Sequence, residues 1–113
     1  MIKIKSLIII LFFLSSNLFA NRFFVDPVNG SESGNGTFSS PWKTLKNVIA
    51  RNLIESRTYK LPYDANNPQL KTKNPGAPIK AGDTIMLYSG LHGEIELVNY
   101  INDDYITIMN VEG

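Results

Sequence analysis

Three short runs rich in apolar and β-branched residues occupy the last third of the chain, at residues 84–88, 94–98 and 105–109. Each run is bounded by Gly, Ser, Asn or Asp residues that favour turns, so each predicts a short β-strand. A fourth run, the aromatic and β-branched residues 22–25, ends at Asp26 and Pro27 and predicts another strand near the start of the chain.

The spacing of the last three runs permits two architectures. A shift of 21 residues aligns Asp83 with Asp104, Ile85 with Ile106 and Leu87 with Ile108, and a period of about 20 to 25 residues is typical of a solenoid of stacked coils. The runs are also separated by five and by six residues, which suits the hairpin turns of a small antiparallel sheet.

An amphipathic helix is predicted over residues 41–56. Ser40 provides the N-cap and Pro41 occupies the first helical position, where its missing N–H costs nothing. The apolar residues at helical spacing are Trp42, Leu45, Val48, Ile49 and Leu53.

Two segments lack the pattern of a helix or a core strand. Residues 29–40 consist mainly of Gly, Ser, Asn and Thr, which predicts a loop. Residues 57–80 contain Pro62, Pro68, Pro75 and Pro78, and we interpret them as an inserted loop without regular structure.

Residues 1–20 have the features of a secretory signal. Lys3 and Lys5 precede an apolar run at residues 7–14, and Ala20 is the small residue expected before a cleavage point. The run is shorter than the roughly 20 residues of a membrane-spanning helix, so we expect no membrane span after cleavage. We predict a secreted, periplasmic or cell-surface location.

Composition limits the partners of the mature chain, residues 21–113. The chain has no cysteine, and removal of Lys3 and Lys5 leaves nine basic and ten acidic residues, a net charge of −1. This charge gives no reason to expect a nucleic-acid partner. Lys71, Lys73 and Lys80 lie in the proline-rich segment and are interpreted as a solvated loop face.

Several residues are candidates for chemistry. His92 lies in a predicted turn without an obvious partner for acid or base work. Tyr88 and Tyr100 could bind sugar rings, but strand aromatics more often serve packing. Glu94 and Glu96 alternate with apolar residues, which favours the solvated side of a strand over a hydrolytic pair or a calcium site.

The turn at Asp103 and Asp104 is likewise favoured over a metal site. The glycine-rich segment lacks the terminal Gly-Lys-Ser/Thr of a phosphate-binding loop and the ligand spacing of an EF-hand. We therefore assign no catalytic, cofactor-binding or metal-binding residue.

Four motifs occur in order along the mature chain: FVDP at 24–27, NGS at 29–31 with GNGT at 34–37, SPWKTL at 40–45, and IKAGDTI at 79–85. In this order they resemble the start of secreted right-handed parallel β-helix proteins of the pectin-lyase-like superfamily, which includes chondroitinase B-like and alginate lyases.

The resemblance implies an all-β fold, with an N-terminal cap helix over the open end and the first coils of a β-helix. On this interpretation residues 21–113 are the start of a truncated domain, whose complete form binds or cleaves an acidic polysaccharide. Calcium is possible in the complete form. We expect no lyase activity from residues 21–113, because the family's catalytic groups lie on later coils.

Two alternatives remain at this point. One is a non-catalytic surface or adhesion protein that uses the β-helix as a stiff rod. The other is a self-contained small β module, which would unfold cooperatively by itself.

Overall fold

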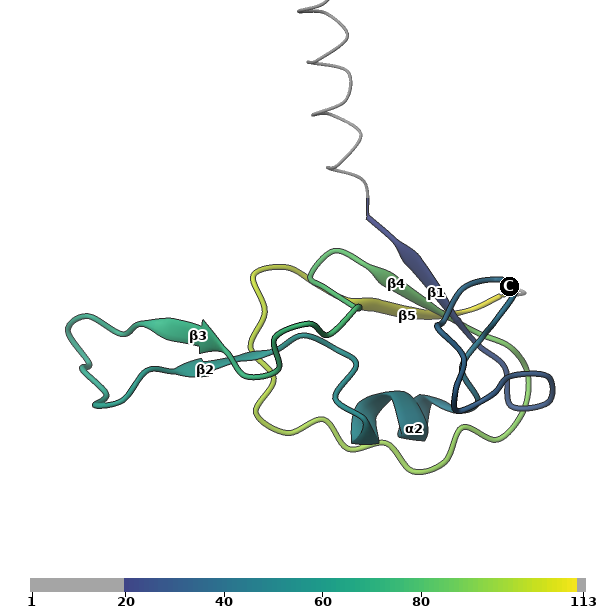
Figure 1. Ribbon diagram of the computed structural model, residues 1–113. Coiled ribbons are helices and arrows are strands. Elements are labelled where there is room, and N and C mark those ends of the chain that lie inside the picture. The colour runs from purple at the N-terminus through teal and green to yellow at the C-terminus, as the bar shows by residue number, and fades with distance from the viewer. Residues whose placement is uncertain (1–19, 112–113) are drawn as a thin grey trace, which may run out of the picture.

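The computed structural model describes residues 20–111 (Figure 1). Its elements in chain order are β1 (Arg22–Val25), α2 (Leu45–Ala50), β2 (Arg57–Tyr59), β3 (Leu70–Thr72), β4 (Thr84–Leu87) and β5 (Thr107–Asn110). Except for Ala20, the predicted signal over residues 1–20 lies outside the described residues. No helix in the described range is long and apolar enough to cross a membrane.

A parallel sheet with the strand order β1-β4-β5 lies above α2 in the view of Figure 1. Phe23 is opposite Ile85, which in turn is opposite Ile108. The sequence-based strand at residues 22–25 is confirmed, and β4 covers most of the predicted strand at residues 84–88.

The two faces of this sheet have different surroundings, because successive side chains of a strand point to opposite sides. Val25 and Ile85 on the inner face are fully buried against the helix side of the molecule. The outer face carries a row formed by Phe24, Met86 and Met109. The side of the sheet that carries this row is the outer face.

One hydrophobic core joins the inner face of the sheet to α2 and to the segments that flank the hairpin. Its buried residues are Val25, Trp42, Leu45, Val48, Ile54, Ile79 and Ile85. The apolar stripe predicted from residues 41–56 therefore identified real core positions. Burial of this kind contributes about 1.5–3 kcal/mol per large side chain.

The helix itself is shorter than predicted. It begins after Thr44, whose hydroxyl accepts a hydrogen bond from the Asn47 backbone N–H at 3.1 Å. The preceding residues are held by β1 instead, because the Trp42 N–H donates to the Phe24 carbonyl at 3.0 Å. The predicted cap at Ser40 and the helix bounds 41–56 were therefore wrong.

The glycine-rich loop packs tightly around the same tryptophan. Gly36 has a φ of +77°, and a Cβ atom there would lie 2.5 Å from the Trp42 ring. Glycine is needed at this position for both reasons.

The proline-rich segment contains a β-hairpin, so its interpretation as an unstructured insertion was wrong. β2 and β3 pair antiparallel, with Thr58 opposite Lys71, and the hairpin projects away from the sheet as an arm (Figure 1). The prolines lie in the tip at 62 and 68 or after β3 at 75 and 78. They therefore do not interrupt the ladder.

The predicted β-helix fold is not what the described residues form. They form one parallel and one antiparallel sheet, both small, and a single six-residue helix. A solenoid requires coils that repeat several strands each, whereas residues 88–106 between β4 and β5 contain no strand. The alternative small antiparallel sheet of the last three runs is also wrong, because β4 and β5 pair in parallel.

Two details of the predicted repeat were wrong for related reasons. The predicted strand at residues 94–98 is irregular and exposed, because its alternation has no partner strand within the described chain. The sheet aligns Ile85 with Ile108, a shift of 23 residues and not 21. The identical Thr-Ile-Met triplets at 84–86 and 107–109 mark this register.

Candidate functional site

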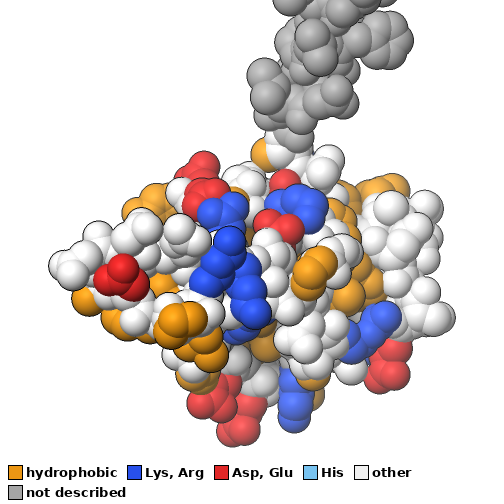
Figure 2. Space-filling view, turned by 60° about the vertical axis from the view of Figure 1, so that its left-hand side comes forward, with side chains coloured by type: hydrophobic (Ala, Val, Ile, Leu, Met, Phe, Trp, Pro, Cys, Tyr) orange, Lys and Arg blue, Asp and Glu red, His pale blue; other side chains and the backbone are white. Residues whose placement is uncertain are grey.

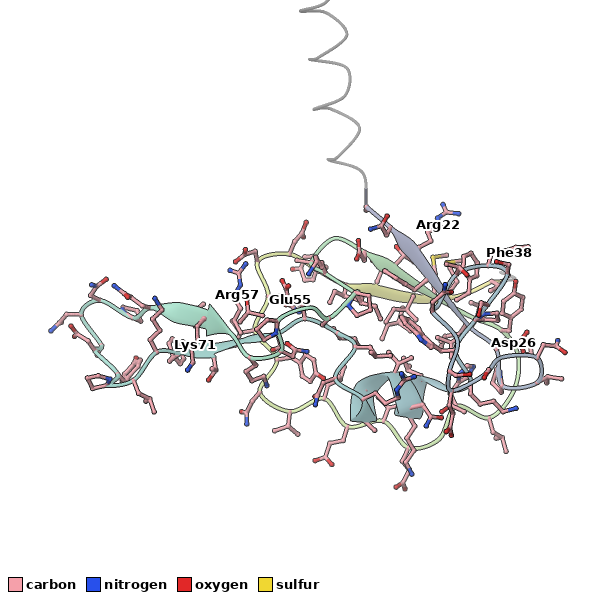
Figure 3. All side chains as sticks on the ribbon, in the orientation of Figure 1. Arg22, Asp26, Phe38, Glu55, Arg57 and Lys71 are labelled. Atoms are coloured by element: carbon pink, nitrogen blue, oxygen red, sulfur yellow. The ribbon has the colours of Figure 1, made fainter. Side chains whose placement is uncertain are left out.

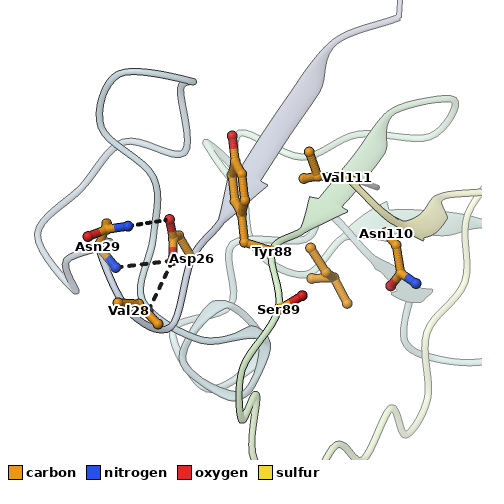
Figure 4. Close-up of a pocket in the computed structure, with 8 residues that line it drawn as sticks. Asp26, Val28, Asn29, Tyr88, Ser89, Asn110 and Val111 are labelled. Atoms are coloured by element: carbon orange, nitrogen blue, oxygen red, sulfur yellow. Dashed lines mark hydrogen bonds between the residues drawn. The ribbon is translucent and has the colours of Figure 1, made fainter. Parts of the chain in front are cut away.

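A cleft of about 360 Å³ lies where the carboxyl ends of β1, β4 and β5 meet (Figure 4). Parallel strands bring their following loops to one edge of the sheet, which is where open sheets commonly bind ligands. The lining residues are Asp26, Val28, Asn29, Leu87, Tyr88, Ser89, Asn110 and Val111.

Asp26 fixes the loop that follows β1. Its Oδ1 accepts hydrogen bonds from the backbone N–H groups of Val28 and Asn29, both at 3.0 Å, and Asn29 Nδ2 donates to Oδ2 at 3.4 Å (Figure 4). Asp followed by such a turn is a common local arrangement, since the carboxylate satisfies N–H groups that the strand leaves unpaired.

The same bonds keep Asp26 ionised. The hydrogen bond from the Asn29 backbone is the largest cause of a lowered pKa for this carboxyl, and the Val28 N–H and the Lys43 charge act in the same direction, whereas burial opposes them. At neutral pH the cleft therefore contains a carboxylate whose Oδ2 retains capacity to accept hydrogen bonds.

Tyr88 enters the cleft directly after β4. Its backbone N–H donates to the Val25 carbonyl at 2.9 Å, and its half-buried ring lies 6.4 Å from the Phe24 ring. Because neighbouring strand ends position it, Tyr88 presents an aromatic surface beside the Asp26 carboxylate.

His92 holds the loop that carries Tyr88 against α2. Its Nε2 donates to the Tyr88 carbonyl at 2.8 Å, and its Nδ1 accepts from the Leu45 N–H at 3.3 Å. These two bonds require the proton on Nε2. The structure thus places His92 in the predicted turn, where it positions the loop of the cleft.

Ser89 and Asn110 supply further polar groups. Ser89 follows Tyr88, and Asn110 is the last residue of β5, paired in register with Leu87. Neither side chain hydrogen-bonds to another residue between 20 and 111. A hydroxyl and an amide are thus available to a ligand in the cleft.

The outer face continues from the cleft as an aromatic surface. The Phe24 ring contacts the ring of the exposed Phe38 edge-on, with centroids 5.5 Å apart. Phe38 lies in the glycine-rich loop at the same end of the molecule as Asp26 (Figure 3). Aromatic rings therefore flank the polar cleft along the outer face.

The remaining candidate residues of the sequence lie elsewhere. Tyr100 lies beneath Lys73, whose Nζ is 5.2 Å from the ring centroid. Glu94 and Glu96 are exposed beside α2. Asp103 pairs with Arg57. No cluster of three or more His, Cys, Asp or Glu side chains suited to a metal occurs among the described residues.

Lys and Arg side chains lie at several separate places on the face shown in Figure 2. Arg57 and Lys71 lie on the hairpin arm, whereas Arg22 lies near the start of β1 (Figure 3). Lys80 pairs with Glu55 at 2.7 Å, and Lys73 donates to the Asn99 carbonyl at 3.0 Å. Lys73 and Lys80 thus interact with neighbouring residues, while Lys71 is exposed on β3.

Sequence reasoning named Tyr88 but missed the cleft. The available signal was an Asp-Pro-Val-Asn turn directly after a strand at residues 26–29. This turn meets Tyr88 and Asn110 only because β1, β4 and β5 pair in parallel. No local sequence pattern shows pairing between segments so distant in the chain.

Comparison with protein-family models, with curated proteins and with solved structures finds no match to the chain. The resemblance to pectin-lyase-like proteins therefore stays a sequence-based prediction.

Proposed function

We propose that the protein binds an uncharged, hydroxyl-rich polysaccharide in the cleft at the carboxyl ends of β1, β4 and β5. The observation that carries the proposal is the set of groups that line one cleft: the Asp26 carboxylate, the Tyr88 ring, and the Ser89 and Asn110 side chains. Together they offer acceptors, donors and an apolar surface, which are the groups that recognise sugars.

The chemistry of each group suits a sugar ring. A sugar hydroxyl can donate to Asp26 Oδ2, and charge-assisted hydrogen bonds are stronger than neutral ones. The Asn110 amide can both donate and accept. Tyr88 offers an apolar ring face for the C–H groups of a sugar, and the exposed Phe38 extends the aromatic surface for a longer chain.

The carboxylate argues for a neutral ligand. A uronic acid carboxylate close to ionised Asp26 would meet like-charge repulsion. The cleft lining contains no Lys or Arg, and Lys43, whose charge lowers the pKa of Asp26, lies outside the lining. The proposal thus replaces the acidic polymer suggested by the sequence resemblance. The predicted secretory signal supports action outside the cytoplasm, where such polymers occur.

Binding is tested by isothermal titration with soluble neutral polymers, namely xylan, galactomannan and mixed-linkage glucan, alongside alginate and polygalacturonate. We expect heat of binding from at least one neutral polymer and none from the acidic ones. Tyr88→Ala should weaken binding by about tenfold, which corresponds to the loss of one aromatic contact.

Asn110→Ala should also weaken binding, and the exposed Asn110 side chain forms no hydrogen bond with another residue in the described part of the chain. The matched control is Tyr105→Ala, which removes a tyrosine that is 88% exposed and lies outside the cleft. Equal affinity for Tyr88→Ala and Tyr105→Ala, or binding only to alginate or polygalacturonate, would contradict the proposal. Reducing-end assays on the same mixtures separate cleavage from binding.

A further inference from the structure

β5 forms an open edge of the parallel sheet. The opposite edge is covered, since the Phe24 N–H of β1 donates to the Gly36 carbonyl of the glycine-rich loop, and the N–H of Trp42, just after that loop, donates to the Phe24 carbonyl. No residue between 20 and 111 pairs with the other side of β5.

The backbone of β5 has groups available for pairing on that side. Thr107 and Val111 direct their N–H groups to β4, at 3.0 Å from the Asp83 carbonyl and 2.9 Å from the Leu87 carbonyl. Alternate residues of a parallel strand point to opposite neighbours. Ile108 and Asn110 therefore direct their backbone groups to the open side.

The side chains of β5 repeat those of β4. Both strands begin with Thr-Ile-Met, yet Ile85 and Met86 are 0% and 8% exposed, whereas Ile108 and Met109 are 40% and 49% exposed. The difference arises because β4 has a neighbour on each side and β5 has one. A further strand beside β5 would complete the burial.

Nothing in this edge discourages pairing. Proteins usually protect an edge strand with a charged residue, a proline or a bulge, but residues 105–111 contain no charge and no proline. Beside β5, a small apolar pocket of about 100 Å³ is lined by Ile54, Leu97, Tyr100, Asn102, Ile106 and Ile108. This pocket offers space for an incoming aliphatic side chain.

We propose that β5 pairs with β5 of a second copy of this chain, in an antiparallel arrangement about a two-fold axis. The partner strand must be uncharged and must place aliphatic residues on the inner face and Met or Thr on the outer face. β5 itself has this pattern and a free edge, and two-fold dimers are the most common homo-oligomers.

A register centred on Ile108 satisfies both the faces and the hydrogen bonds. Ile108 then lies opposite its symmetry mate on the inner face, and Thr107 lies opposite Met109 on the outer face. Because the backbone groups of Ile108 point to the open side in both copies, they form a hydrogen-bonded pair. The result is a continuous six-stranded sheet.

The oligomeric state of the protein purified after expression of the full chain tests this proposal. We expect sedimentation velocity to show a dimer that dissociates on dilution, since an interface of this size is small. Ile108→Lys places a charge on the edge and should raise the dissociation constant at least about tenfold. Leu61→Lys, at an 85% exposed position in the hairpin tip, should leave it unchanged.

Disulfide cross-linking gives a second test that does not rely on the Ile108→Lys variant. The chain has no cysteine, so Ile108→Cys introduces a single thiol whose symmetry mate would lie about 5.5 Å away between Cα atoms, within disulfide range. Mild oxidation should yield a disulfide-linked dimer from Ile108→Cys and far less from Leu61→Cys.

Three results would overturn the proposal. They are a monomer at all concentrations, a dimer that Ile108→Lys leaves intact, and equal cross-linking of the two cysteine variants. Because this interface uses the edge of β5, failure of sugar binding in the cleft would leave its test unaffected.

Discussion

Replacement of Asp26 by Asn tests the link between the loop after β1 and the stability of the sheet. The side chain of Asp26 accepts hydrogen bonds from the N–H groups of Val28 and Asn29 at 3.0 Å. Asparagine keeps one acceptor oxygen but loses the negative charge. The substitution is nearly isosteric, so it changes the electrostatics of the turn more than its packing.

The expected cost follows from the bonds that weaken. Loss of a side chain that caps backbone N–H groups costs about 0.5–2 kcal/mol. We expect Asp26→Asn to lower the free energy of unfolding by about 1 kcal/mol and Asp26→Ala by about 2 kcal/mol, because alanine removes the acceptor entirely. For a domain of this size, a loss of 1 kcal/mol lowers Tm by about 4–8 °C.

The pH dependence has a definite sign. The pKa of Asp26 is lowered in the folded protein, so the stabilisation by its charge is fully present above the unfolded pKa. It is lost as the pH falls through the lowered folded pKa. The stability difference between the wild type and Asp26→Asn should therefore be constant near neutral pH and should shrink in acid.

Urea unfolding followed by circular dichroism at a series of pH values measures both effects. Asp64→Asn is the matched control, because Asp64 accepts a similar bond from the Asn66 N–H at 2.9 Å in the exposed hairpin tip. Its substitution should cost less than about 0.5 kcal/mol. An equal loss of stability in Asp26→Asn and Asp64→Asn would refute the reasoning. A stability difference between the wild type and Asp26→Asn that grows in acid would also refute it.

Two further substitutions test the core and the loop that carries Tyr88. Ile85→Ala removes a fully buried side chain from β4 and should cost about 2–5 kcal/mol in urea unfolding, whereas Ile95→Ala at an exposed position should change stability by less than about 0.5 kcal/mol. A similar loss at both positions would contradict the burial assigned to β4. His92→Ala removes both ring hydrogen bonds and should lower the free energy of unfolding by about 1–2 kcal/mol. His92→Gln, whose amide can still donate and accept, should recover part of this loss. Full stability of His92→Ala would show that His92 does not hold the Tyr88 loop against α2.

The sequence predicted those elements whose signal is local. The strand at residues 22–25 and most of β4 were recognised because aromatic and β-branched residues are followed by strong turn formers. The buried positions of the helix were also recognised from their spacing. Its bounds were wrong because Trp42 pairs with β1, a tertiary contact that removes the first predicted turn from the helix.

The errors concern pairing between distant segments. Alternation at residues 94–98 suits a strand, but a strand forms only where a partner lies beside it. The four prolines of residues 57–80 predicted a segment without regular structure. They lie outside the two strands of the hairpin, however, and so do not prevent strand pairing. The cleft was missed for the same reason, since Asp26 and Tyr88 meet only after β1 pairs with β4.

The register of the parallel sheet also sets the order in which the chain can fold. Arg22 of β1 pairs with Thr84 of β4. The ribosome therefore adds about sixty further residues after β1 before the strand that pairs with it has been synthesised. Contacts between such distant segments carry a large loop-closure entropy and slow folding. During synthesis Phe23, Phe24 and Val25 therefore remain an unpaired apolar strand, which a chaperone could hold until β4 emerges.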